Sequence, residues 1–160
     1  MLSSLGETAK PLAGGQTLIP ILKLRMDEPS DLVDIGRLPD LRFARQDDGW
    51  VRIGALSPHG WVAKSEIAAA IPIIKDCAGG IADVQVRSRG TIGGSVSAAD
   101  PNCDWPALLN ALDAEILCSG PDGERTMFPS RGASEQLTAV DPAWLEGVEL
   151  LHLTAYSFAS

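Results

Sequence analysis

Two short segments of the chain combine glycine with small polar side chains, the residue types that can hold an anionic group. Glycine lets backbone N–H groups approach a ligand closely, and short hydroxyl side chains add further hydrogen bonds. Diphosphate oxygens are suitable ligands for such a concave site, because backbone N–H groups bind them without any net positive charge. The residues concerned are Ala13, Gly14, Gly15, Gln16, Thr17 and Leu18 in the first segment, and Thr91, Ile92, Gly93, Gly94 and Ser95 in the second.

Each segment also has a simpler interpretation when taken alone. The first fits a plain tight turn whose glycines tolerate positive φ, and the second fits a glycine bulge between strands. Familiar nucleotide motifs fit neither of them: no G-x-x-x-x-G-K-[ST] is present, and no G-x-G-x-x-G follows a strand and opens a helix. The sequence therefore disfavours a phosphate-loop NTPase and a Rossmann dinucleotide fold.

The other polar residues predict no catalytic triad. His59 and His152 are the only histidines, and each is interpreted as a surface or packing residue rather than a general base. Asp100 and Asp104 do not read as paired carboxylates, because Pro101 between them favours an extended chain. We expect Asp104 to cap a helix and to be able to accept hydrogen bonds from a ribose diol.

Charge and composition exclude several classes of partner. The net charge is -8 and no block of basic residues interrupts it, so the long-range field should repel nucleic acid and anionic membranes. No apolar run free of charge and proline reaches about 18 residues, and "MLSSLGETAK" is unlike a secretory signal. Cys77, Cys103 and Cys118 fit inert core thiols of a cytoplasmic protein better than a disulfide framework or a zinc site.

Turn residues and apolar periodicity predict the elements that must position the two segments. Strands are expected over Leu32–Ile35 and, after a hairpin turn at Asp48-Gly49, over Trp50–Ala55. Ser57–Ala82 should be helical with a break at Pro72. A helix through "WPALLNALDA", two strands around a turn at Pro121-Asp122-Gly123, and a last strand within "LEGVELLHLTAY" complete the expectation.

Long stretches of the chain resemble a known family. The stretches "LAGGQTLIPILKLRMDEPSDLVDIGRLPDL", "RIGALSPHGWVAKSEI" and "IPIIKDCAGGIADVQVRSRGTIGGSVSAADPNCDWPALLNALDAEI" are similar to the FAD-binding medium subunits of molybdenum hydroxylases of the carbon monoxide dehydrogenase and xanthine dehydrogenase family. The similarity runs from about Lys10 to Arg125 and contains both glycine-rich segments in the family's order. That order is more specific than either segment alone.

The resemblance implies a cofactor, partners and roles for residues. The two segments, residues 13–18 and 91–95, would close on the diphosphate of FAD. Asp104 would meet ribose or ribityl hydroxyls, and Asp100 matches a position at the flavin end of the site. No metal ligand is expected in this chain. A molybdenum-cofactor large subunit and an iron–sulfur small subunit would be its partners, and the flavin would pass electrons from the clusters to an external acceptor.

The same resemblance implies an α+β fold of the vanillyl-alcohol-oxidase and p-cresol-methylhydroxylase superfamily. A small parallel-stranded subdomain over residues 1–50 would pack against a larger subdomain over residues 51–160, which would contain a mainly antiparallel sheet and helices. Relatives start with an earlier strand and helix and carry a further C-terminal subdomain, so the chain is expected to be truncated at both ends. The alternatives are a module that acts only by subunit association, or a relative that oxidises alcohols or reduces enol ethers at the flavin.

Overall fold

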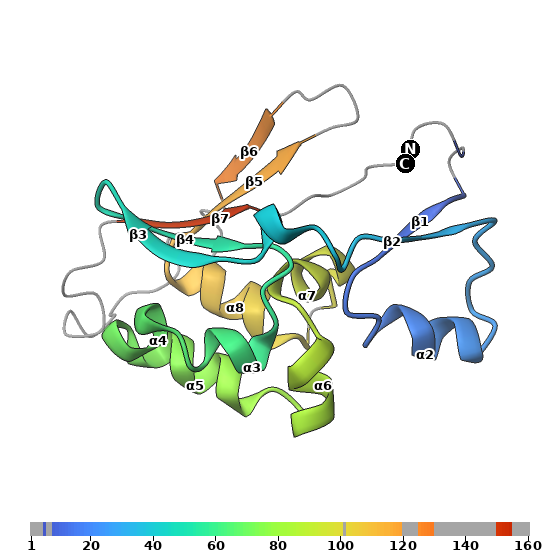
Figure 1. Ribbon diagram of the computed structural model, residues 1–160, viewed down its shortest axis with the longest axis horizontal. Helices are drawn as coiled ribbons and strands as arrows, with labels where there is room; N and C mark the ends of the chain where they lie inside the picture. The colour runs from blue at the N-terminus through green and yellow to red at the C-terminus, as the bar shows by residue number, and fades with distance from the viewer. Residues whose placement is uncertain (1–4, 6–7, 101, 120–124, 130–149, 155–160) are drawn as a thin grey trace.

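A computed structural model of the chain describes residues 5, 8–100, 102–119, 125–129 and 150–154, and these residues form two sheets. A two-stranded sheet with one helix lies on the right in Figure 1, and a five-stranded sheet with the remaining helices lies on the left. An α+β architecture is therefore confirmed.

The small sheet is a parallel pair joined by a helical crossover. Strands β1 (Lys10–Leu12) and β2 (Leu32–Asp34) pair in parallel, and helix α2 (Leu18–Lys23) lies between them in the sequence. Parallel strands need such a long connection, and here the first glycine-rich segment forms its opening turn. The expected parallel unit is confirmed, and the strand predicted to end at Ile35 ends one residue earlier.

The large sheet has the strand order β3-β4-β7-β5-β6. The predicted hairpin is confirmed: Asp48 and Gly49, both with positive φ, connect two antiparallel strands. The strands are β3 (Ala44–Asp47), β4 (Trp50–Gly54), β5 (Glu115–Ser119), β6 (Arg125–Pro129) and β7 (Leu150–Thr154).

The expectation of a mainly antiparallel large sheet is wrong. The last strand, β7, lies between β4 and β5 and runs parallel to both, whereas β3–β4 and β5–β6 are antiparallel. The sheet is therefore mixed. Alternation of side chains marks a strand but carries no information about the direction of its neighbours, so the sequence pattern did not reveal the central parallel strand. The predicted strand in "LEGVELLHLTAY" is confirmed as β7, and the predicted turn at residues 121–123 lies outside the described residues.

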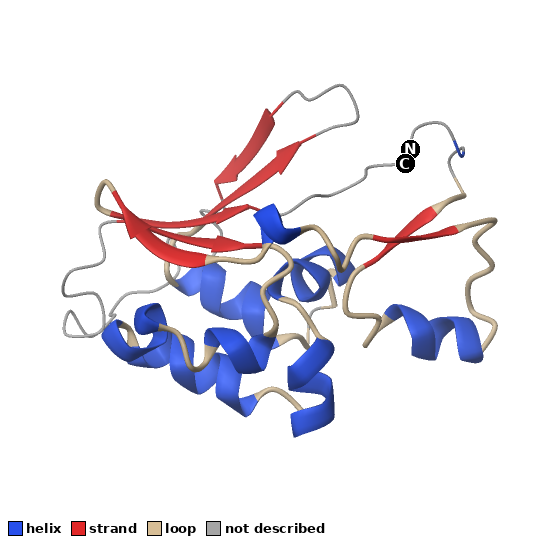
Figure 2. Cartoon of the chain, viewed as in Figure 1, coloured by secondary structure: helices blue, strands red, loops and turns tan. Residues whose placement is uncertain are grey.

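Helices cover one face of the large sheet, as Figure 2 shows. The helical prediction for residues 57–82 is confirmed by three of them, and Pro72 opens the longest as expected. A short 3-10 turn, η1 (Pro39–Leu41), precedes β3. The helices are α3 (His59–Val62), α4 (Glu66–Ala70), α5 (Pro72–Gly80), α6 (Val84–Arg89), α7 (Ile92–Ala98) and α8 (Asp104–Ala111).

The start of α8 corrects one expectation. Cys103, not Asp104, occupies the N-cap position, and no side chain there accepts a hydrogen bond. Asp104 is instead the first helical residue, where its negative charge complements the positive end of the helix dipole. The pattern of apolar residues located the helix correctly, but it could not distinguish the capping residue from its neighbour.

The core lies between the helices and the large sheet. Trp105 of α8, Ile53 of β4 and Ile74 of α5 are fully buried there. Cys118 is buried and Cys77 packs against the core cluster, as expected for inert thiols, whereas Cys103 is only half-buried and is not the core thiol that was expected. Burial, with a smaller effect of the Asp104 charge, raises the pKa of Cys77 to about 12. In the described part of the chain no helix is long and apolar enough to cross a membrane.

Candidate functional site

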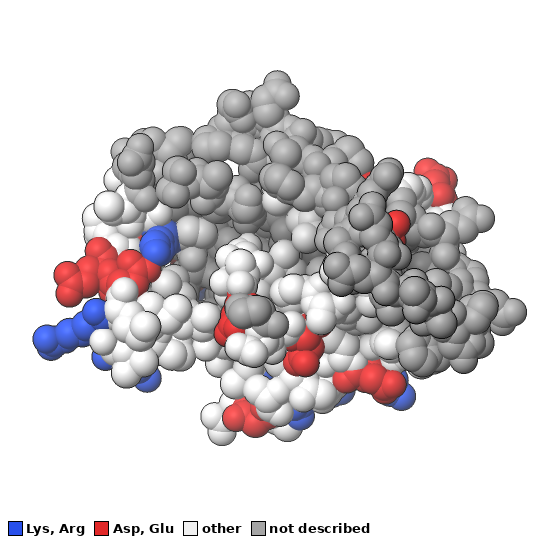
Figure 3. All heavy atoms as spheres, turned by 180° about the vertical axis from the view of Figure 1, so that it is seen from behind, with Lys and Arg blue, Asp and Glu red and all other residues white. Residues whose placement is uncertain are grey.

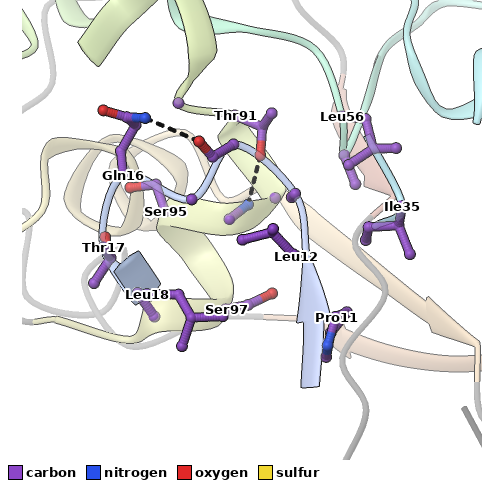
Figure 4. A pocket seen from close by; sticks show the side chains of 18 of the residues that line it. Pro11, Leu12, Gln16, Thr17, Leu18, Ile35, Leu56, Thr91, Ser95 and Ser97 are labelled. Atoms are coloured by element: carbon purple, nitrogen blue, oxygen red, sulfur yellow. Dashed lines mark hydrogen bonds between the residues drawn. The ribbon is translucent and has the colours of Figure 1, made fainter. Parts of the chain in front are cut away.

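A cavity of about 410 Å³ lies between the two units and brings the glycine-rich segments together. Its volume is within the usual range for small-molecule sites. Figure 4 shows Gln16, Thr17 and Leu18 of the first segment close to Thr91 and Ser95 of the second. Of the predicted site residues, ten line the cavity: Ala13, Gly14, Gly15, Gln16, Thr17, Leu18, Thr91, Gly93, Gly94 and Ser95.

The first segment forms the turn from β1 into α2. Gly15 has a φ of 71°, which favours glycine, and the Gln16 side chain closes the turn by donating from Nε2 to the Gly14 carbonyl at 2.9 Å. The Ile19 N–H donates to the Gly15 carbonyl at 3.1 Å. Within the described part of the chain, the N–H groups of Gly15, Gln16 and Thr17 have no acceptor. These three N–H groups are therefore not used by the described part of the chain.

The second segment is a helix start, not a turn or a bulge, which corrects the sequence-based expectation. Thr91 is the N-cap of α7, and its Oγ1 accepts from the Gly94 N–H at 3.1 Å. The N–H of Ile92 donates to the Ser57 carbonyl at 3.2 Å and that of Gly93 to the Ala55 carbonyl at 2.8 Å. Because these donors are used inside the protein, this side of the cavity offers hydroxyl groups and shape rather than a row of free N–H groups.

The capping role of Thr91 predicts a stability change. Thr91→Val keeps the shape of the side chain but removes the acceptor for the Gly94 N–H. We expect it to lower the free energy of unfolding by about 1–2 kcal/mol, measured by urea denaturation. Thr91→Ser retains the oxygen and should stay much closer to the wild type. Equal stability of the valine and serine variants would contradict the capping role.

Glycines let the two segments and the large sheet approach each other. A Cβ on Gly14 would lie 2.1 Å from the Arg89 carbonyl oxygen, and one on Gly93 would lie 2.6 Å from the Ala55 Cβ. Neither position has room for a side chain, so Gly14 packs directly on the α6–α7 junction and Gly93 on the end of β4. The glycines of both segments therefore shape the cavity walls by close backbone packing.

His59 also lines the cavity, although the sequence indicated a surface or packing residue. The packing role is confirmed: the residue is 4% exposed, and its Nδ1 accepts from the Trp105 indole Nε1–H at 3.0 Å. Burial lowers the pKa of His59 to about 4, with a smaller opposing effect of Asp104. Since Trp105 lies 46 positions away in the sequence, no local signal could have marked this contact. The side chain of His152 lies outside the described residues.

Three predicted site residues lie away from the cavity. Ile92 is fully buried in the core. Asp100 accepts hydrogen bonds from the backbone and side chain of Asn102 and borders a separate hollow beside α7 and α8. Asp104 is exposed on the first turn of α8 and lines neither space. The chain alone does not bring the two carboxylates to the cavity.

The sequence interpretation missed an ion pair at the cavity wall. Lys10 of β1 and Asp27, in the connection from α2 to β2, form a salt bridge, and both line the cavity. Lys10 is the only lysine or arginine among the described lining residues. On the face shown in Figure 3, acidic and basic side chains are interspersed. Capture of an anion would therefore depend on local donors, mainly the first turn, with Lys10 at one edge.

Together, the fold and the cavity define a cofactor-binding α+β domain in which a glycine-rich βα turn faces the start of a second helix. Residues 1–131 match the family described as the FAD binding domain in molybdopterin dehydrogenase. The chain belongs to this family, which confirms the resemblance seen in the sequence.

Similar proteins are oxidoreductase subunits. The chain is 44% identical over 128 residues to the carbon monoxide dehydrogenase medium chain of Hydrogenophaga pseudoflava, covering 79% of this chain and 45% of that one. It is 41% identical over 122 residues to the glyceraldehyde dehydrogenase medium chain of Sulfolobus acidocaldarius, covering 76% and 43%. The solved carbon monoxide dehydrogenase of H. pseudoflava matches with a TM-score of 0.77 and 44% identity, over 82% of this chain and 46% of that one. The chain spans about half the length of these relatives.

Proposed function

We propose that the chain supplies the FAD-binding part of a molybdenum hydroxylase-type dehydrogenase, taking electrons from iron–sulfur clusters to an external acceptor. The single observation that supports this function is the cavity that joins the two glycine-rich segments. The fold would be that of the vanillyl-alcohol-oxidase superfamily, with two subdomains. Because β3 (Ala44–Asp47) pairs with β4 in the large sheet, the boundary would lie before residue 44 rather than between residues 1–50 and 51–160. A molybdenum-cofactor subunit and an iron–sulfur subunit would be its partners.

The residues of the cavity fit the groups of FAD. The N–H groups of Gly15, Gln16 and Thr17, which have no acceptor within the described part of the chain, would hold the diphosphate, and the Ser95 hydroxyl would add a further donor. Apolar side chains such as Leu56 and Ile35 would exclude water around the bound cofactor. When bound, the flavin can accept electrons singly and pass them on in pairs. Asp100 and Asp104 would take part only if the rest of the complex brought ligand groups to them.

Binding can be tested with the purified chain and added FAD. We expect FAD to bind with a shift in flavin absorbance and to slow alkylation of Cys103, because this half-buried thiol lines the cavity. Cys77 is the internal reference, since its raised pKa keeps it a thiol and unreactive with or without FAD. A folded chain that takes up no FAD would contradict the proposal and favour a module that acts only through subunit association.

A further inference from the structure

His59 gives the cavity a hydrogen-bond donor with a fixed position. Its ring is held from the core side, because Trp105 Nε1–H donates to Nδ1 at 3.0 Å and the two rings stack with centroids 6.2 Å apart. An indole nitrogen is only a donor, so Nδ1 must be unprotonated. The proton of the neutral imidazole is therefore on Nε2, on the other side of the ring.

The Nε2–H group faces the region of the cavity beside Gly90. A Cβ on Gly90 would lie 3.0 Å from Nε2, and Gly90 itself lines the cavity. No described residue accepts a hydrogen bond from Nε2. Among the described residues, Arg52 Nε is the only side-chain nitrogen or oxygen that has neither solvent contact nor a hydrogen-bond partner. Since His59 Nε2 also has no partner there, it must keep some contact with solvent. His59 is 4% exposed and lines the cavity, so we infer that this small exposed part of the side chain faces the cavity.

The position of this donor relates it to the first glycine-rich turn. Gly14 packs against Gly90, with a would-be Cβ 2.8 Å from the Gly90 Cα, and Gly90 in turn packs against the imidazole. The turn and His59 therefore both contact Gly90. A phosphate group held by the N–H groups of residues 15–17 would find Nε2–H as a further donor along the same wall.

We propose that His59, fixed by Trp105, donates a hydrogen bond from Nε2 to a phosphate oxygen of the dinucleotide in this cavity. This inference rests on the proposed FAD function. It assigns to His59 a ligand contact, and to Trp105 the role of a positioning residue that selects the tautomer and holds the ring.

Two substitutions of His59 separate the acceptor role of Nδ1 from the donor role of Nε2. His59→Asn places an amide oxygen near the position of Nδ1, which preserves an acceptor for Trp105, but it removes the donor at Nε2. His59→Gln places an amide N–H near the position of Nε2, which preserves the donor, but it removes the acceptor for Trp105. A purely structural histidine would make the glutamine variant the worse binder, whereas the proposed contact makes it the better one.

The test measures FAD affinity by fluorescence quenching, thermal stability by circular dichroism, and the ³¹P spectrum of bound FAD. We expect His59→Asn to bind FAD about 10- to 100-fold more weakly and to shift a ³¹P resonance, since a phosphate oxygen loses a donor. His59→Gln should stay within about threefold of wild-type affinity while melting at a lower temperature. Wild-type FAD affinity in the asparagine variant, with an unchanged ³¹P spectrum, would overturn this inference but not the proposed function. If the folded wild-type chain binds no FAD, the proposed function fails and this inference with it.

Discussion

Gly14→Ala is expected to weaken FAD binding by about 5- to 150-fold. The new Cβ would lie 2.1 Å from the Arg89 carbonyl oxygen and 2.8 Å from the Gly90 Cα, and both are backbone atoms that cannot rotate away. The turn must therefore move off the α6–α7 junction. Overpacking of this kind typically costs about 1–3 kcal/mol, and the affinity range is that energy converted to a binding constant. Isothermal titration with FAD and urea denaturation would measure both effects.

Gly79→Ala is the matched control. A Cβ at Gly79 in α5 meets nothing within 4 Å, and alanine favours the helix over glycine by up to about 1 kcal/mol. This variant should bind FAD like the wild type and be at least as stable. If Gly14→Ala also bound FAD with wild-type affinity and stability, the close contact between the first turn and the α6–α7 junction would not be needed for the site.

Acid should destabilise the wild type more steeply than the His59→Asn variant. In the folded chain the pKa of His59 is about 4, against an ordinary value of 6.5. As pH falls below 6.5, the unfolded chain binds a proton at this residue that the folded chain does not. Stability is therefore lost between pH 6.5 and about 4, by roughly 3 kcal/mol in total, and this contribution levels off below pH 4.

Carboxylates also lose stabilising interactions in acid, so the informative quantity is the difference between two pH profiles. Asparagine cannot bind the proton but can still accept from Trp105, so subtracting the His59→Asn profile isolates the histidine. Urea denaturation at pH 7, 6, 5 and 4 gives both curves. Parallel curves would show that His59 takes up its proton equally in the folded and unfolded chain, contrary to its burial.

Local sequence patterns predicted most of the elements that position the site. Asp48-Gly49 has the turn chemistry of a two-residue hairpin, and Pro72 suits a first helical turn, so both were correctly placed. The first glycine-rich segment was interpreted as a turn and is one, because Gly15 requires a positive φ. These features depend on a few neighbouring residues, and such residues constrain the backbone directly.

Other features depend on contacts between distant segments. Thr91 and the glycines after it fitted a glycine bulge between strands, yet Thr91 caps a helix and Gly93 packs closely on Ala55, just after β4. In the same way, β7 runs parallel to its two neighbours, a direction that no alternation pattern encodes. At Gly93 the reason for glycine is close packing, whereas at Gly15 it is the positive φ.

The amino-acid sequence by itself determined the family and the two segments that face the cavity, since their residue types and order are specific even without coordinates. Only the tertiary structure decided which hydrogen-bond donors remain for a ligand. The N–H groups of Ile92 and Gly93 are used by the carbonyls of Ser57 and Ala55, whereas those of the first turn have no acceptor in the described chain. His59 became a donor to the cavity because Trp105, brought close by folding, binds the other nitrogen of its ring. Each group's availability depends on partners far away in the sequence, and only folding brings those partners into contact.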